Sequence, residues 1–154
     1  MIDLRYFTSG EFGTWWPDMS VRLLVLLDVF RHEWGDEVMV SPHSRALGRR
    51  NGEDDTSQHN VDRWGEVRAG DVFAIGMIRH RHAERAVRIA RSIGITGIGV
   101  YPDWTLGGKR CAGLHFDARR EADPGNPATW GGVDNGSGKQ VYVSLEDALA
   151  RMPT

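Results

Sequence analysis

The longest helical pattern in the chain lies in residues 19–34. Large apolar side chains recur there at intervals of four, three and four residues, which places them on one face of a helix. They are Leu23, Leu27, Phe30 and Trp34. Gly35 follows this stretch directly and suits the end of a helix. We therefore predict a buried amphipathic helix over residues 19–34.

A second helix is predicted over residues 83–93, where alanine and branched apolar residues recur at helical spacing before Gly94. Near the end of the chain, Ser144 stands three residues before Asp147 and opens an apolar pattern, which predicts the N-cap of a short terminal helix. Residues 7–16 instead mix aromatic residues with glycine and polar residues, which indicates an irregular segment.

Four short apolar runs predict strands. They are residues 37–40, 71–78, 97–101 and 111–119. Residues 141–143 predict a small edge strand. Residues 124–138 are rich in glycine, asparagine and proline, and they predict a long loop.

The run at residues 111–119 alternates between two kinds of side chain. A strand of period two places Leu114 and Phe116 on one face, toward a core, and His115 and Asp117 on the other. The second set is a row of polar side chains aimed at a shared space. This alternation is the strongest indication from the residues alone of a functional site.

Composition narrows the classes of function. The chain has 154 residues, enough for one domain with its own core, and its net charge of −2 argues against a dedicated nucleic-acid-binding protein. Cys111 is the single cysteine, so any metal has to be held by His, Asp or Glu. Neither a secretory signal nor a membrane span is readable in the sequence.

Two histidines on short segments with nearby carboxylates suggest a zinc site. A hydrolytic zinc is held by about three protein ligands and leaves one position open for water. His59, His115 and one carboxylate would supply such a set. Either histidine taken alone is more often a structural residue with hydrogen-bonded nitrogens, and it is the polar surroundings of both that favour the zinc interpretation.

Five segments in a fixed order resemble the peptidase M15 family, the zinc D-Ala-D-Ala carboxypeptidases and related L-Ala-D-Glu endolysins that act on peptidoglycan. They are SPHSR at residues 41–45, SQH at 57–59, AGDV at 69–72, GIGVYP at 97–102 and LHFDAR at 114–119. The resemblance implies a small α+β fold with helices packed on a mostly antiparallel sheet, like that of hedgehog proteins and D-Ala-D-Ala peptidases. We expect one zinc peptidase-like domain over residues 1–154.

The resemblance also implies site residues. The zinc ligands would be His59, an acidic residue after it and His115, and Arg45 would bind the substrate or stabilise an oxyanion. In the family the Asp usually follows the first His by seven residues. In this chain Glu66 follows His59 by seven residues. Asp71 follows His59 by twelve residues, but in a context that matches the family better. We therefore predict Asp71 as the third ligand, with Glu66 as the alternative.

The general base departs from the family pattern. Many members carry an acid three residues before the second His, and this position is Ala112 here. Asp117 is the nearest carboxylate on the strand face that carries His115, and it is predicted as the base. The alternative is that Asp117 orients His115 or pairs with Arg45 or Arg119.

These features predict a zinc metallopeptidase that hydrolyses a peptide bond in the peptidoglycan stem, either a phage-type lysin or a D-Ala-D-Ala carboxypeptidase-like enzyme. We expect a monomer made in the cytoplasm without a signal peptide, acting on the cell wall after release or as part of a virion. Two alternatives stay open. One is a non-catalytic zinc or wall-binding module such as a virion component, and the other is a small binding domain without metal.

Overall fold

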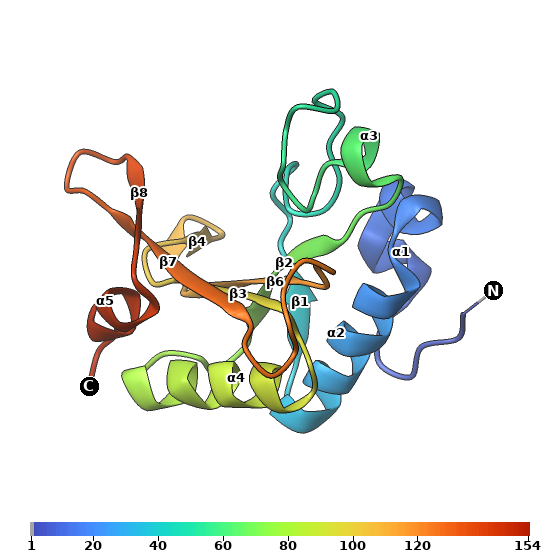
Figure 1. The fold of residues 1–154 in the computed structure, drawn as a ribbon. Helices are drawn as coiled ribbons and strands as arrows, with labels where there is room; N and C mark the ends of the chain where they lie inside the picture. Colours follow the sequence, from blue (N-terminus) through green and yellow to red (C-terminus); the bar gives the residue numbers. More distant parts are fainter. Residues whose placement is uncertain (1) are drawn as a thin grey trace.

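A mixed six-stranded sheet forms the centre of the protein in the computed structural model, which describes residues 2–154 (Figure 1). In spatial order its strands are β1 (Val38–Val40), β2 (Ala69–Ala74), β6 (Gly113–Asp117), β3 (Gly97–Tyr101), β7 (Ala128–Asp134) and β8 (Gln140–Val143). β3 and β7 run parallel, and each other neighbouring pair is antiparallel. The predicted α+β class and mostly antiparallel sheet are confirmed.

Three helices pack against the sheet. They are α2 (Val21–Trp34), α4 (His80–Ser92) and α5 (Leu145–Ala150). The short elements are α1 (Ser9–Phe12), a 3-10 helix (Gly13–Asp18), α3 (Val61–Trp64) and the hairpin of β4 (Thr105–Leu106) and β5 (Lys109–Arg110). Figure 1 shows α4 below the sheet, and the segment around α3 and the β7–β8 hairpin above it. One face of the sheet is thus left for a site.

Helix α2 follows the predicted apolar stripe. Leu23, Leu27, Phe30 and Trp34 are all buried. The helix ends at Gly35, whose φ of 78° is the left-handed conformation that glycine adopts without a steric penalty. It begins at Val21, two residues later than predicted, because Met19 forms a β-bridge with Val67 and Ser20 is the N-cap.

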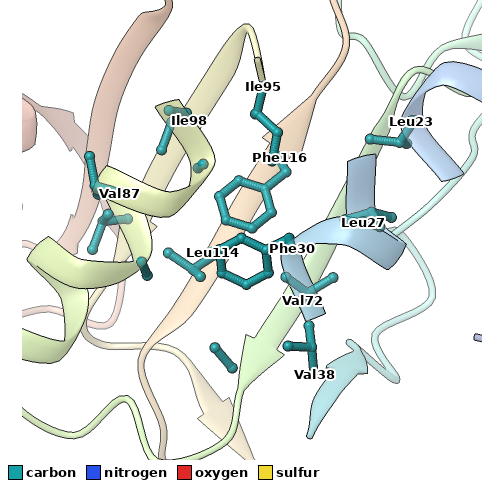
Figure 2. Close-up of a cluster of buried hydrophobic side chains, with 14 of the residues drawn as sticks. Leu23, Leu27, Phe30, Val38, Val72, Val87, Ile95, Ile98, Leu114 and Phe116 are labelled. Atoms are coloured by element: carbon teal, nitrogen blue, oxygen red, sulfur yellow. The ribbon is translucent and has the colours of Figure 1, made fainter. Parts of the chain in front are cut away.

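The hydrophobic core lies between these helices and the sheet (Figure 2). Phe30 of α2 meets Phe116 of β6 edge to face, with ring centroids 4.6 Å apart. Leu114 and Ile98 are fully buried beside them. Each such side chain contributes roughly 1.5–3 kcal/mol by burial. The core therefore fixes β6 firmly at the centre of the sheet.

Two predicted strands have different bounds in the structure. β6 is shorter than the predicted run of residues 111–119, although its alternation is confirmed, with Leu114 and Phe116 in the core. β2 begins two residues before the predicted residue 71, and it ends at a turn in which Gly76 has a φ of 86°. The turn explains why the apolar run of residues 71–78 does not continue as one strand.

The prediction of a loop over residues 124–138 was wrong in its middle part, because residues 128–134 form β7. Gly131 and Gly132 lie within this strand, and because glycine has a low strand propensity the sequence does not indicate a strand there. In the folded protein a Cβ atom at Gly131 would overlap Ala148 of α5, so the glycine permits close packing of helix and strand. Tertiary contacts thus override the local propensity.

Residues 7–16 were also predicted wrongly, as irregular. Thr8 and Glu11 form a capping box that opens α1, with the Thr8 N–H donating to Glu11 Oε2 at 2.7 Å. Phe12 is buried and anchors the turn. At the other end of the chain the predicted cap of α5 is confirmed, since Ser144 Oγ accepts from the Asp147 N–H at 3.0 Å. No helix within residues 2–154 is both long and apolar enough to cross a membrane.

Candidate metal centre

A row of four residues crosses the open face of the sheet. Asp71 on β2 pairs with His115 on β6. His115 in turn pairs with Gly99 on β3, which pairs with Trp130 on β7. Because side chains alternate along a strand and Leu114 points into the core, this row lies on the face away from the helices. The sheet register therefore sets Asp71 and His115 side by side.

His59 reaches this row from the segment that precedes α3. The Arg49 N–H donates to the His59 carbonyl, and the Val61 N–H donates to the Arg49 carbonyl, each at 3.0 Å. Asn60 is fully buried, and its side chain holds the loop of residues 51–55 through hydrogen bonds. These bonds fix the backbone on both sides of His59, so its side chain has a defined direction.

His59, Asp71 and His115 converge on one point. The His59 Nε2 atom lies 3.3 Å from His115 Nδ1 and 3.5 Å from Asp71 Oδ1. His115 Nδ1 lies 3.0 Å from Asp71 Oδ1. Both histidines are buried, and one ligand atom from each of the three residues lies within 4.8 Å of the others. The structure thus brings together the three residues that the sequence predicts as ligands, and they are called the metal cluster below.

The outer ring nitrogen of each histidine faces a hydrogen-bond acceptor. His59 Nδ1 donates to the Leu47 carbonyl, because a carbonyl oxygen can only accept. His115 Nε2 lies 3.0 Å from Asp117 Oδ2. Because both outer nitrogens have partners of their own, the inner nitrogens, His59 Nε2 and His115 Nδ1, face the Asp71 oxygen. A metal bound there would displace any proton on these nitrogens and take up their lone pairs.

Two carboxylates, those of Asp71 and Asp117, flank His115. Although burial disfavours the carboxylate of Asp71, hydrogen bonds from His115 and His59 lower its pKa to about 2. Burial lowers the pKa of His59. Burial also opposes protonation of His115, but the carboxylates of Asp117 and Asp71 outweigh it and raise the pKa of His115 to about 9. Asp71 is therefore an ionised ligand group, and a metal that binds His115 has to displace a proton from it.

Asp117 lies behind His115. Its side chain has no exposed surface, and its two oxygens accept from Arg119 Nε at 2.8 Å and Nη2 at 2.6 Å. Despite burial, the hydrogen bonds from Arg119 and His115 hold the pKa of Asp117 well below its usual range, so it stays ionised. Of the two roles predicted for Asp117, these contacts favour the orientation of His115, because the carboxylate reaches the metal cluster only through that ring.

Two glycines of β3 make room for this network. A Cβ atom at Gly97 would overlap the carboxylate of Asp117, and one at Gly99 would lie 2.8 Å from Trp130 Nε1. Trp130 lies beside the ring of His115, with centroids 5.1 Å apart, and the guanidinium carbon of Arg119 lies 5.1 Å from the indole centroid. The sequence does not single out Trp130 as a site residue, whereas Arg119 was named as a possible partner of Asp117 and forms that pair here. The Gly-x-Gly spacing of β3 is the signal that could have located Trp130.

The metal cluster opens into a cleft of about 1010 Å³. The segment before His59 forms one wall, on which Arg45 and Arg49 line the cleft. Arg45, expected from the family resemblance, is exposed, and its N–H donates to His43 Nδ1 at 3.2 Å. Arg49 is a residue that sequence reasoning missed. Its buried Nε has no hydrogen-bond partner within residues 2–154, and the same holds for Gln58 Oε1. Two buried polar atoms beside the cleft are therefore left without a partner among the described residues.

Glu66, the alternative third ligand, lies outside the metal cluster. Its Oε1 accepts from Arg68 Nε and Arg120 Nη2, both at 3.3 Å. It precedes β2, whereas Asp71 lies within that strand and is positioned by the sheet. The geometry thus favours Asp71.

Comparison of the chain with protein-family models, with curated proteins and with solved structures found no match. The family resemblance of the five sequence segments therefore stays a prediction. Evidence for function has to come from the geometry and chemistry of the site itself.

Proposed function

We propose that the protein is a zinc-dependent peptidase that hydrolyses a peptide bond in the peptidoglycan stem. The proposal rests on one observation above all, the triangle of His59 Nε2, Asp71 Oδ1 and His115 Nδ1 on the floor of an open cleft. Two imidazole nitrogens and one carboxylate oxygen form the ligand set that zinc hydrolases use. Calcium and magnesium, by contrast, are held by oxygen ligands.

The spacing of the ligand atoms supports zinc. In a tetrahedral site with bonds of about 2.0–2.1 Å, two ligand atoms lie about 3.3–3.4 Å apart. The three separations in the metal cluster are 3.3, 3.5 and 3.0 Å, close to that value. The hydrogen bonds to the outer nitrogens of both histidines are of the kind that orients zinc ligands. The residues present therefore fit this metal.

The chain's own residues have distinct roles in this proposal. Zinc, when bound, supplies a Lewis acid and lowers the pKa of a water molecule to about 7. Asp117 keeps His115 in one orientation through its outer nitrogen. Arg45 and Arg49 place two positive charges on the wall next to His59. They suit a carboxylate of the stem peptide, or the oxyanion that develops at the scissile carbonyl.

A second candidate, a non-catalytic zinc or wall-binding module, is favoured by one observation. In the described part of the chain, the carboxylates that line the cleft besides Asp71 are Asp55, Asp103 and Asp134, and each already accepts from a backbone N–H. Ala112, where many M15 peptidases carry an acid, belongs to the core. A peptidase would have to recruit one of these three occupied carboxylates as its base.

Turnover of purified peptidoglycan separates the two candidates. The zinc-loaded protein is expected to release stem-peptide fragments that mass spectrometry identifies, and the chelator-treated protein is expected to release none until zinc is restored. Stoichiometric zinc with no fragment released would support the module and contradict the peptidase. Failure to bind zinc after addition of the metal would exclude both.

Replacing Asp117 with asparagine is expected to weaken zinc binding by roughly 10- to 100-fold, the usual effect of losing a partner that orients a metal ligand. Asparagine keeps the shape of the side chain but removes the charge that holds His115 and Arg119. Competition with a chromophoric chelator measures the dissociation constant. Asp123→Asn makes the same change at an exposed carboxylate and should bind as wild type. A wild-type dissociation constant for Asp117→Asn would exclude the orienting role.

A further inference from the structure

The cleft continues past the metal cluster to a second wall. This wall is formed by Tyr101, Trp104 and Tyr142, and is called the aromatic wall below. Figure 1 shows its elements, the β4 region and the β7–β8 hairpin, rising across from the segment around α3. A cleft of about 1010 Å³ lies at the upper end of the roughly 300–1,000 Å³ typical of ligand pockets. It therefore has room for more than the two residues beside one scissile bond.

The rings of the aromatic wall lie against the sheet. Tyr101 and Trp104 are stacked, with centroids 4.1 Å apart and an interplanar angle of 16°. Two glycines make this placement possible. A Cβ atom at Gly113 would overlap the Trp104 ring, and one at Gly132 would overlap the Tyr101 ring. The backbone beneath them therefore limits how far the rings can move.

The polar atoms of the two inner rings have partners within the protein. Trp104 Nε1 donates to Gln140 Oε1 at 2.9 Å, and the Tyr101 hydroxyl accepts from Trp130 Nε1 at 2.8 Å. These bonds set the ring planes before a ligand arrives, which lowers the entropy cost of binding. Tyr142 extends the wall. Its exposure of 75% is the highest among the large hydrophobic side chains of residues 2–154.

We propose that the aromatic wall, through its rings Trp104 and Tyr142, binds a sugar ring of the glycan strand to which the stem peptide is attached, while the buried Tyr101 supports Trp104 from within. A pyranose ring has a flat C–H face that stacks on an aromatic face, and a rim of hydroxyl groups that needs hydrogen-bond partners. Thr105 and Gln140 line the cleft next to Trp104 and are exposed, so they can serve that rim. An apolar peptide side chain would bind better in an enclosed apolar pocket than at this exposed wall with polar groups around it.

This inference rests on the proposed function and narrows its substrate. The wall that carries Arg45 and Arg49 belongs to the segment that joins β1 to β2. The metal cluster is centred on β2 and β6. The aromatic wall belongs to β3, the loop after it and β8. The cleft thus offers positive charge at one end and stacking surface at the other. A stem peptide still linked to its sugar fits both ends, whereas a free stem peptide fits one.

A peptide-free probe tests the sugar site separately from catalysis. The probe is a β-1,4-linked tetrasaccharide of N-acetylglucosamine, titrated into the zinc-loaded protein and followed by NMR. We expect shifts in the amides of residues 140–142 and in the indole N–H of Trp104. Tyr142→Ala should weaken binding by about tenfold, because it removes a stacking surface. Val141→Ala alters the neighbouring residue on the other face of β8 and should bind as wild type.

Kinetics supply a second readout. Tyr142→Ala should lower kcat/KM for glycan-linked muropeptides about tenfold more than it lowers kcat/KM for the free stem peptide. Three results would overturn the inference: no shifts with the tetrasaccharide, equal affinity of Tyr142→Ala and wild type, or the same shifts with the free stem peptide. Tetrasaccharide binding without hydrolysis of any substrate would instead contradict the proposed peptidase and support the sugar site.

Discussion

Replacing Asp71 with alanine is expected to abolish zinc binding and to lower the turnover of peptidoglycan by roughly 10³-fold or more. A catalytic metal supplies several kcal/mol of transition-state stabilisation, and each 1.36 kcal/mol changes a rate about tenfold. Asp71 supplies the carboxylate oxygen of the metal cluster, 3.0 Å from His115 Nδ1. Elemental analysis of the protein dialysed against zinc measures the metal, and fragment release measures the turnover.

Glu66→Ala is the matched control for this experiment. It removes the other acidic residue that the sequence offers as third ligand, and it breaks ion pairs with the buried Arg68 and the exposed Arg120. We expect it to keep one zinc per chain and turnover within a few-fold of wild type, because neither arginine belongs to the metal cluster and Arg68 keeps its ion pair with Glu121. Loss of zinc in Glu66→Ala with retention in Asp71→Ala would show that the ligand is the acid seven residues after His59 and would refute the arrangement described here.

Replacing Gly97 with alanine is expected to destabilise the fold by about 1–3 kcal/mol and to weaken zinc binding at least tenfold. The added methyl group would overlap the carboxylate of Asp117. This carboxylate has no exposed surface and is held by Arg119 and by His115, so it can move only by breaking one of these contacts. Urea unfolding measures the stability loss, and chelator competition measures the zinc affinity.

Gly70→Ala provides the control for this substitution. Gly70 also lies in the sheet and directly precedes Asp71, but a Cβ atom there would meet Leu27 and Leu47 at 3.6 Å, which is ordinary van der Waals contact. We expect the free energies of unfolding and of zinc binding each to differ from wild type by no more than about 0.5 kcal/mol, the usual effect of a surface mutation. If both glycine variants bound zinc like wild type, Asp117 would not act on the metal cluster through His115.

The predicted ligands came from two different kinds of sequence signal. The alternation in β6 placed His115 and Asp117 opposite Leu114 and Phe116, and the structure agrees, because the period of a strand is a local property of the backbone. The zinc interpretation of His59 rested on the polar residues around it and on the family resemblance. No local pattern reports that His59 lies beside a residue 56 positions away.

Some roles could not be read from the chain because they depend on pairing between distant strands. β7 was predicted as a loop, since Gly131 and Gly132 have low strand propensity, yet its parallel pairing with β3 brings Trp130 next to His115. Arg49 belongs to no motif that the sequence singles out. In the folded protein its backbone pairs with the His59 segment, and its side chain lines the cleft.

The sequence by itself determined the buried stripe of α2 and the faces of β6, because these follow from periods of 3.6 and 2 residues along a single segment. The α+β class was expected from the family resemblance, and the sheet and helices agree with it. Only the tertiary structure decided between Asp71 and Glu66, and placed Asp117 behind His115 instead of in the cleft. Both depend on the register of β2, β6 and β3. A register is set by the packing of whole strands, and a shift of one residue would turn every side chain of a strand to its other face.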